Sequence, residues 1–366
     1  MGHDRPPTVE PGARPWSNGG MAEFRRVTHG PQFHHLLLRV AGYASDDALT
    51  AAREALAEGR VEDVARAVGA AATAHGLAVS DEDFALLTAT APESVAELST
   101  TGDQSEPAFE FQPALADPGL FGAGGPPPML DLTDAPFPLV DALTDEADRA
   151  AIESMSRDPG AVALWRAWRF GATAEPARIF LLEADVAADD LPAVTAVFQR
   201  ELVAGGLAEV FAPGTELPSY QAQARAASAL LWTAADAAPV RIARAFDGVD
   251  PASGPWFAAN HPRLSEDEAA RVADLLDAGL AVLATTQRMD DVMEPARGQV
   301  VPMTYRTNGS WIWTDTVSYY LRTYGLAPDP DLLAELTASG PVDAVAEHRA
   351  LSALFRPAES AAVWSA

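Results

Sequence analysis

The stretch that decides the fold runs from residue 178 to residue 211 and reads RIFLLEADVAADDLPAVTAVFQRELVAGGLAEVF. Its first seven residues form a short apolar run, which is typical of a buried strand. Residues 191–203 place apolar side chains on one helix face, two glycines end that helix, and residues 209–212 resume as a strand. A strand, a helix and a further strand in this order predict a helix-covered, at least partly parallel sheet.

The same alternation extends to both sides of this stretch. Toward the C-terminus, we expect a helix over residues 220–235 and a strand over residues 240–246, where every second residue shares one side. Toward the N-terminus, Asp158 followed by proline is typical of a helix start, and we expect that helix to end at Gly171. The sequence therefore predicts an α+β (or α/β) fold.

The C-terminal third adds another helix and strand, and then a β-hairpin followed by helices. Ser265 begins a capping-box pattern, so we expect a helix that ends at Gly279, before a buried strand from residue 280. Farther on, Asn308 and Gly309 have the side chains that a two-residue type I′ turn requires, because both positions need positive φ.

This turn fixes the expected hairpin register. It pairs Arg306 with Trp311 and Thr304 with Trp313, so that the arginine and the two tryptophans share one face. Two interpretations of this face remain open. It is either an aromatic recognition surface that uses cation–π contacts, or core covered by the following helix, and we favour core.

Composition divides the chain into segments. The N-terminal quarter has helical patterning with capping residues, and a stretch rich in proline and glycine follows it. Phe109 and Phe111 lie in this linker, and aromatic residues in linkers often dock onto a neighbouring surface. The predicted segments are a disordered tail (1–22), a helical domain (23–99), a linker (100–136), a mixed α/β domain (137–340), and a C-terminal helix and tail (341–366).

The composition excludes several classes of chemistry. The chain of 366 residues contains no cysteine, and all 25 of its basic residues are arginine. Without cysteine there are no disulfides, thiolate zinc sites, iron–sulfur clusters or Cys nucleophiles. Without lysine there is no P-loop or kinase lysine and no Schiff-base catalysis.

The formal net charge of −27 bears on partners and location. Neutralising phosphates needs clustered positive charge, which is not visible, so we expect neither nucleic acid nor an anionic membrane as a partner. A basic protein partner fits the charge, although the charge can also serve solubility alone. No apolar run approaches the length of a membrane span or a signal peptide, so we expect a cytoplasmic location.

Candidate site residues occur in two places. Asp290, Asp291 and Glu294 are carboxylates suited to acid–base work or to a divalent ion, or alternatively to a capped, salt-bridged turn. His261 lies in a loop after a strand, where α/β proteins often bind ligands. The densest histidine group, His29, His34 and His35 with Glu23, is expected to be an ordinary helix start, and we predict neither a metal nor a cofactor.

A resemblance accompanies the hairpin. The segment VPMTYRTNGSWIW (301–313), followed by SYYL (318–321) and YGLAPDP (324–330), resembles the C-terminal segment of uncharacterised proteins of GC-rich actinobacteria. The resemblance implies a lineage and no activity. The first functional hypothesis rests on the charge, the absence of catalytic motifs and the aromatic residues of the linker. It is a non-enzymatic interaction protein, such as an immunity, adaptor or regulatory protein, with a basic partner. The alternative is a hydrolase-type enzyme that uses the carboxylates and His261 in an α/β crevice.

Overall fold

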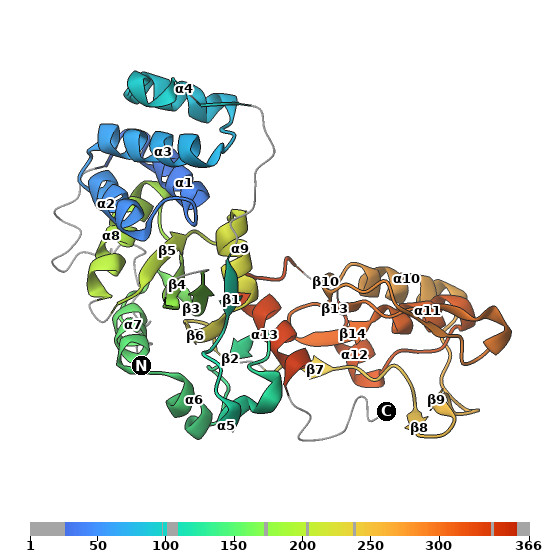
Figure 1. Ribbon diagram of the computed structural model, residues 1–366. Coiled ribbons are helices and arrows are strands. Elements are labelled where there is room, and N and C mark those ends of the chain that lie inside the picture. Colours follow the sequence, from blue (N-terminus) through green and yellow to red (C-terminus); the bar gives the residue numbers. More distant parts are fainter. Residues whose placement is uncertain are drawn as a thin grey trace, which may run out of the picture. The chain divides into compact units, whose positions relative to one another are not determined.

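The computed structural model describes residues 26–96, 98–100, 109–171, 175–202, 205–236, 239–337 and 340–356. The expected N-terminal tail lies outside these residues. The chain forms two compact units, residues 1–115 with 135–235 (unit 1) and residues 116–134 with 236–366 (unit 2). Both units combine helices with strands, so the predicted α+β fold is confirmed (Figure 1). No helix in the described part of the chain has the length and apolar composition of a membrane span.

Unit 1 is built on a twisted sheet. Its strands follow the order β6 (Ala229–Thr233), β3 (Ala161–Phe170), β4 (Ala177–Ala184) and β5 (Leu207–Phe211), and β1 (Glu110–Gln112) also pairs with β3. Strands β4 and β5 are parallel, as expected from the connecting helix, whereas β3 pairs with its neighbours in antiparallel fashion. Trp165 and Phe180 are fully buried in the core of this unit.

The helix expected between Asp158 and Gly171 is wrong, because this segment forms the long central strand β3. The side chain of Asp158 accepts a hydrogen bond from the amide of Gly160 and so closes a turn instead of capping a helix. The run after it is buried on both faces over most of its length, and apolar periodicity alone cannot separate a buried strand from a buried helix. The helix expected over residues 220–235 is likewise shorter, with α9 (Ser219–Ala226) followed by β6.

The N-terminal helices are those that the sequence predicts, but they belong to unit 1 instead of a separate domain. The helices of unit 1 besides α9 are α1 (Gly30–Val40), α2 (Asp46–Ala57), α3 (Val61–His75), α4 (Asp81–Thr90), α6 (Phe137–Leu143), α7 (Glu146–Ser156) and α8 (Leu191–Glu201), with single 3₁₀ turns η3 (Pro92–Val95) and η5 (Ala188–Asp190). Helix α2 packs against both α3 and α8, and α1 packs against α8 as well.

Side chains from these helices cover the outer edge of β5. The backbone amide of Ala208 donates to Gln199 of α8, and its carbonyl accepts a hydrogen bond from Arg53 of α2. The carbonyl of Val210 is bonded to the ring of His34 of α1. The exposed polar edge that a terminal strand would otherwise present is therefore closed from within the chain.

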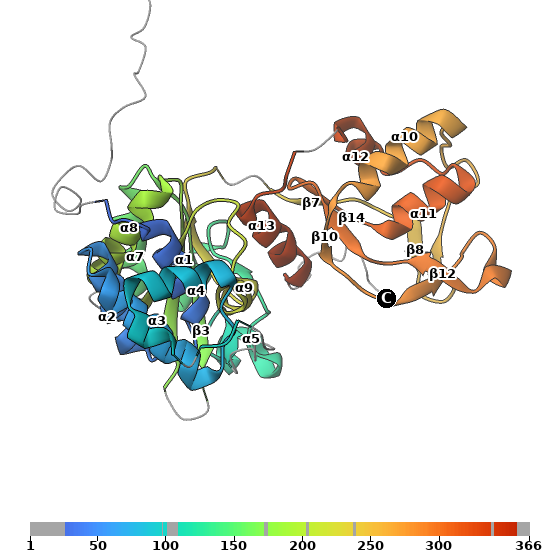
Figure 2. The same cartoon turned by 90° about the horizontal axis from the view of Figure 1, so that it is seen from above.

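Unit 2 contains a four-stranded sheet in the order β10 (Leu280–Leu283), β13 (Tyr305–Thr307), β14 (Trp311–Thr314) and β7 (Arg241–Ile242). Helices α10 (Glu266–Asp277), α11 (Asp315–Tyr324) and α12 (Pro330–Glu335) lie together on one side of these strands (Figure 2). The remaining elements are α5 (Pro118–Phe121), η4 (Gly122–Gly124), β2 (Leu130–Asp131), α13 (Ala344–Phe355) and η6 (Pro295–Arg297), with two small hairpins, β8 (Gly248–Asp250) with β9 (Gly254–Trp256), and β11 (Arg288–Asp290) with β12 (Gln299–Pro302).

The β13–β14 hairpin exists, but its expected type I′ turn is wrong. Arg306 pairs with Trp313, two residues beyond the expected partner. The two loop residues are Gly309 and Ser310, since only Gly309 has positive φ (+95°) and the amide of Asn308 donates to the carbonyl of Trp311. Asn308 instead precedes the loop, where its side chain accepts hydrogen bonds from the amides of Ser310 and Trp311. Because the shift is two residues, each side chain keeps its expected face.

Candidate functional site

The candidate catalytic residues of the sequence lie around one aromatic cluster in unit 2. Tyr320 of α11 is buried at its centre, with its ring in contact with Phe246 and Phe257 and stacked on Tyr324. Tyr320 and Tyr324 are four residues apart on one helix, so that they share a face. His261 lies at one side of this cluster and Asp291 at another.

Asp291 is fully buried, and both of its carboxylate oxygens are engaged. One oxygen accepts hydrogen bonds from the hydroxyls of Tyr319 (2.8 Å) and Tyr324 (2.5 Å), and the other accepts from the amides of Met293 and Glu294. Burial alone would raise the pKa of Asp291, but these hydrogen bonds together hold it below its ordinary value. Asp291 is therefore a charged carboxylate, and its hydrogen bonds hold the loop between β11 and β12 in place.

The neighbouring charges do not form a carboxylate pair. The side chain of Arg297 comes to 3.7 Å from Asp291 and donates to the hydroxyl of Tyr324 at 3.3 Å. Asp290 and Glu294 are exposed, and Glu294 lies 3.9 Å from Arg297. Of the three carboxylates that the sequence grouped, only Asp291 enters the cluster. Its side chain caps the amides of Met293 and Glu294, and the 3₁₀ turn η6 begins after them at Pro295.

His261 has partners at both ring nitrogens. Its Nδ1 lies 2.9 Å from a carboxylate oxygen of Asp247, and its Nε2 lies 2.9 Å from the carbonyl oxygen of Ala327. Both partners of the ring, the carboxylate and the carbonyl oxygen, are hydrogen-bond acceptors. Asp247 also accepts from the amide of Ala258; burial alone would raise its pKa, but these hydrogen bonds lower it. His261 thus connects three loops of unit 2.

The two candidate groups do not meet. The ring of His261 contacts Phe257, whose ring contacts Tyr320, so two aromatic side chains separate the histidine from the tyrosine–Asp291 contacts. A general acid and base must both reach the reacting group, directly or through one water. The arrangement holds loops together and shows no such shared space between His261 and Asp291.

The face of Arg306, Trp311 and Trp313 is core. Both tryptophans are buried beneath α10, α11 and α12, and the ring of Trp313 approaches Gly279 so closely that a Cβ there would overlap it. The guanidinium of Arg306 donates to Asp315 at 2.6 Å and to the carbonyl of Gly279. These contacts agree with the favoured core interpretation and leave no open aromatic surface at the two rings.

The histidine group also separates. His34 is buried, whereas His35 and His29 are exposed, and Glu23 lies outside the described residues. Burial lowers the pKa of His34 to about 4. Across the described ranges, no three potential ligands come close enough to hold a metal ion.

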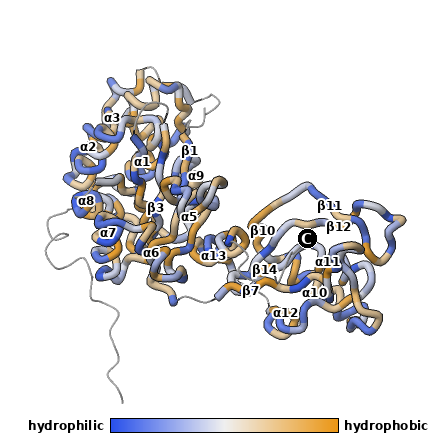
Figure 3. Tube along the Cα trace, turned by 60° about the horizontal axis from the view of Figure 1, so that its bottom comes forward, coloured by the Kyte–Doolittle hydropathy of each residue, from blue (hydrophilic) through white to orange (hydrophobic). Residues whose placement is uncertain are grey.

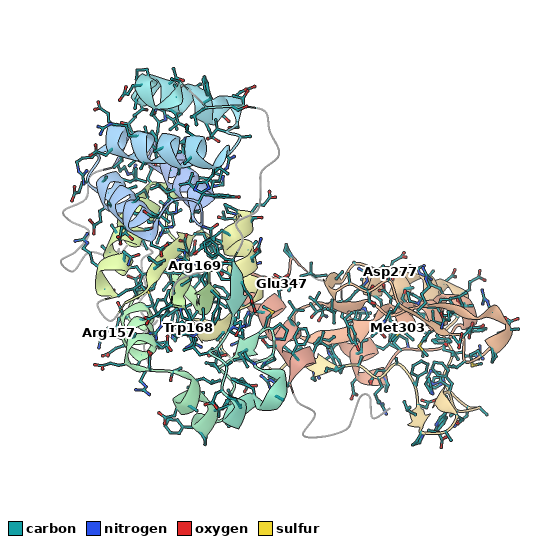
Figure 4. The ribbon with its side chains drawn as sticks, in the orientation of Figure 1. Arg157, Trp168, Arg169, Asp277, Met303 and Glu347 are labelled. Carbon is teal, nitrogen blue, oxygen red and sulfur yellow. The ribbon has the colours of Figure 1, made fainter. Side chains whose placement is uncertain are left out.

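Sequence reasoning missed two ion pairs of unit 1, of which one is buried and the other is partly exposed. Arg166 of β3 donates to Asp148 at 2.6 Å, with both side chains almost fully buried. Its neighbour Arg169, which Figure 4 labels beside Trp168, forms a bidentate pair with Asp46 and lies over the ring of Phe109 at 4.7 Å. No local pattern predicts these pairs, because Asp148 and Arg166 are 18 residues apart and Asp46 and Arg169 are 123 residues apart.

One small pocket lies among the N-terminal helices of unit 1. It is lined mainly by aliphatic side chains together with Arg39 and Tyr43, and its volume is about 20 Å³. This is room for about one water molecule, and the guanidinium of Arg39 is already bonded to Asp83. The pocket therefore offers no place for a substrate.

Comparisons with known proteins identify no relative. No model of a protein family matches the chain, and neither curated proteins nor solved structures give a significant match.

Proposed function

We propose that the protein is a non-enzymatic interaction protein with an immunity, adaptor or regulatory role, and that its partner is a basic protein. The observation that carries the proposal is the excess of 27 negative charges, because it is the property through which the chain can select a partner at a distance. Both units share this excess. Exposed carboxylates begin α4 in unit 1 (Asp81 and Glu82) and α10 in unit 2 (Glu266 and Asp267).

The contacts of the candidate catalytic groups support the same proposal. A hydrolase-type enzyme based on His261 would need a ring nitrogen that can exchange a proton with substrate or water. Its two nitrogens instead face Asp247 and Ala327, and the oxygens of Asp291 face tyrosines and amides. No specific contact favours the enzymatic alternative over binding.

The test is to identify the partner by affinity capture from the native host and to measure its association rate against salt. A basic partner should associate more slowly as salt rises from about 50 to about 300 mM, where screening changes strongly. As a variant, Glu266→Gln with Asp267→Asn removes two exposed charges of α10 and leaves the capping pair Ser265–Glu268 in place. Its association rate is compared with that of Asp81→Asn with Glu82→Gln, which removes the same number of exposed charges from α4.

Two results would contradict the proposal. One is a partner with a net negative charge. The other is an association rate that does not change across the salt series, which would show that the charge of the chain serves solubility alone.

A further inference from the structure

The sheet of unit 2 ends in an open edge at β10. Among the described residues, β10 pairs only with β13, so its other edge has no strand beside it. Leu280, Ala281 and Leu283 are all exposed although they belong to a strand. Helix α13 packs against β10, but no other strand among the described residues pairs with the backbone amides and carbonyls that alternate toward this edge.

The side chains of β10 add an apolar surface to this edge. Leu280 pairs with Thr307 and Leu283 with Tyr305, and a bulge at Val282 separates the two pairs. The two leucines consequently project on the same face of the sheet, each with more than a third of its surface exposed. No charged residue occurs from Ala278 to Gln287, and the hydrophobic colour of β10 is visible in Figure 3.

The outer edge of β5 in unit 1 is protected differently. On β5, the side chains of Arg53, Gln199 and His34 occupy the outward backbone groups. Native edge strands are usually protected by such cover or by charged residues. Strand β10 has its bulge and the packing of α13 against it, but it has no charged residue, in a chain that is otherwise rich in carboxylates.

We propose that β10 pairs in antiparallel orientation with β10 of a second copy of this chain, which joins two four-stranded sheets into one continuous sheet. An antiparallel edge is complementary to its own copy under two-fold symmetry, because each strand offers the alternation of donors and acceptors that the other needs. The pairing places the exposed leucines Leu280 and Leu283 of the two copies against each other and removes them from water.

The charges at the two ends of this segment favour the second copy as the occupant. Asp274 and Asp277 are exposed just before β10, at the end of α10 where Figure 4 labels Asp277, and both also pair with Arg322. Arg288 is exposed just after β10. Antiparallel pairing brings the beginning of one segment to the end of the other. Arg288 of each copy therefore approaches the acidic end of the other copy.

The salt dependence of this pairing distinguishes it from the proposed function. Two copies repel each other at long range, since each has a net charge of −27. Added salt screens this repulsion, so the dimer should become tighter as salt rises, whereas binding of a basic partner should weaken. Either proposal can therefore fail without the other.

The experiment is sedimentation analysis of the full chain over a range of protein concentrations, with charged variants of β10. The wild type should dimerise reversibly. Leu280→Arg with Leu283→Arg should raise the dimer dissociation constant by about tenfold or more, because like charges then face each other. When this variant is mixed with the variant Leu280→Glu with Leu283→Glu, a mixed dimer should form, because opposite charges then face each other. Leu115→Arg and Leu120→Arg, at exposed leucines elsewhere, are the matched controls.

Hydrogen exchange on the wild type gives a measurement that requires no variant. The amides of residues 280–283 should become more protected as protein concentration rises. A wild type that stays monomeric, a dimer that the arginine variant leaves unchanged, or protection at β10 only in the presence of another protein would each overturn the proposal.

Discussion

A terminal nitrogen of Arg53 lies 2.6 Å from a carboxylate oxygen of Glu209, although 156 residues separate them in the chain. Both side chains are almost fully buried. The same carboxylate oxygen accepts a hydrogen bond from Gln221, and Arg53 also donates to the carbonyl of Ala208. This contact fastens the N-terminal helices to strand β5 and makes them part of unit 1.

Removing one partner of this pair should be strongly destabilising. We expect Arg53→Met to lower the free energy of unfolding by about 3–5 kcal/mol, because Glu209 would remain buried without its counter-ion. The double variant Arg53→Met with Glu209→Leu should lose less than the sum of the single changes. Urea denaturation measures the free energy of unfolding of Arg53→Met, of Glu209→Leu and of the double variant. Arg60→Met removes exposed ion pairs and should change stability little, and an equally small effect at Arg53 would contradict the buried pair.

His34 should make stability depend on pH in weakly acidic solution. Its pKa is about 4 in the folded protein and about 6.5 when unfolded, so the unfolded chain binds the additional proton between these values. The contribution is complete above about pH 6.5 and is lost as pH falls toward 4, by up to about 3 kcal/mol. His34→Gln should flatten the stability curve in this window relative to His35→Gln at an exposed position. Parallel curves for the two variants would show that His34 is accessible to protons.

Asp291 should support the tyrosine cluster as an anion. We expect Asp291→Asn to lower the free energy of unfolding by about 1–3 kcal/mol near neutral pH, because hydrogen bonds to a charged acceptor are lost. Since the folded pKa lies below the ordinary value of about 3.8, the contribution is present above that value and disappears as pH falls below it. Asp290→Asn is the exposed control. If both variants melt alike at every pH, the hydrogen bonds to the carboxylate of Asp291 do not stabilise the fold.

The hairpin turn can be tested by three substitutions. Gly309→Val should cost about 1–3 kcal/mol, because a β-branched residue would have to adopt positive φ. Asn308→Gly should also cost about 0.5–1.5 kcal/mol through loss of the side-chain hydrogen bonds to Ser310 and Trp311, whereas a type I′ turn would tolerate it. Asn308→Asp keeps an acceptor and should be nearly neutral. Thermal melts of the three variants decide between the turns.

Local patterns were sufficient for several elements. The apolar run of β4, the one-sided face of α8 and the strand after two glycines were all predictable, as was the capping box that begins α10. Each depends on interactions within a few residues, such as a cap, a glycine with positive φ or a repeated apolar spacing. The sequence by itself determined these elements because the responsible partners are neighbours in the chain.

Only the tertiary structure decided the rest. Residues 161–170 became a strand because they are buried on both faces at the centre of a sheet, where apolar spacing no longer distinguishes strand from helix. The hairpin register depended on whether the side chain of Asn308 or its backbone would form the turn. The engagement of His261 with Asp247 and Ala327, and of Arg53 with Glu209, required distant segments to meet. Burial and distant hydrogen-bond partners are properties of the packed chain, so no window of sequence contains them.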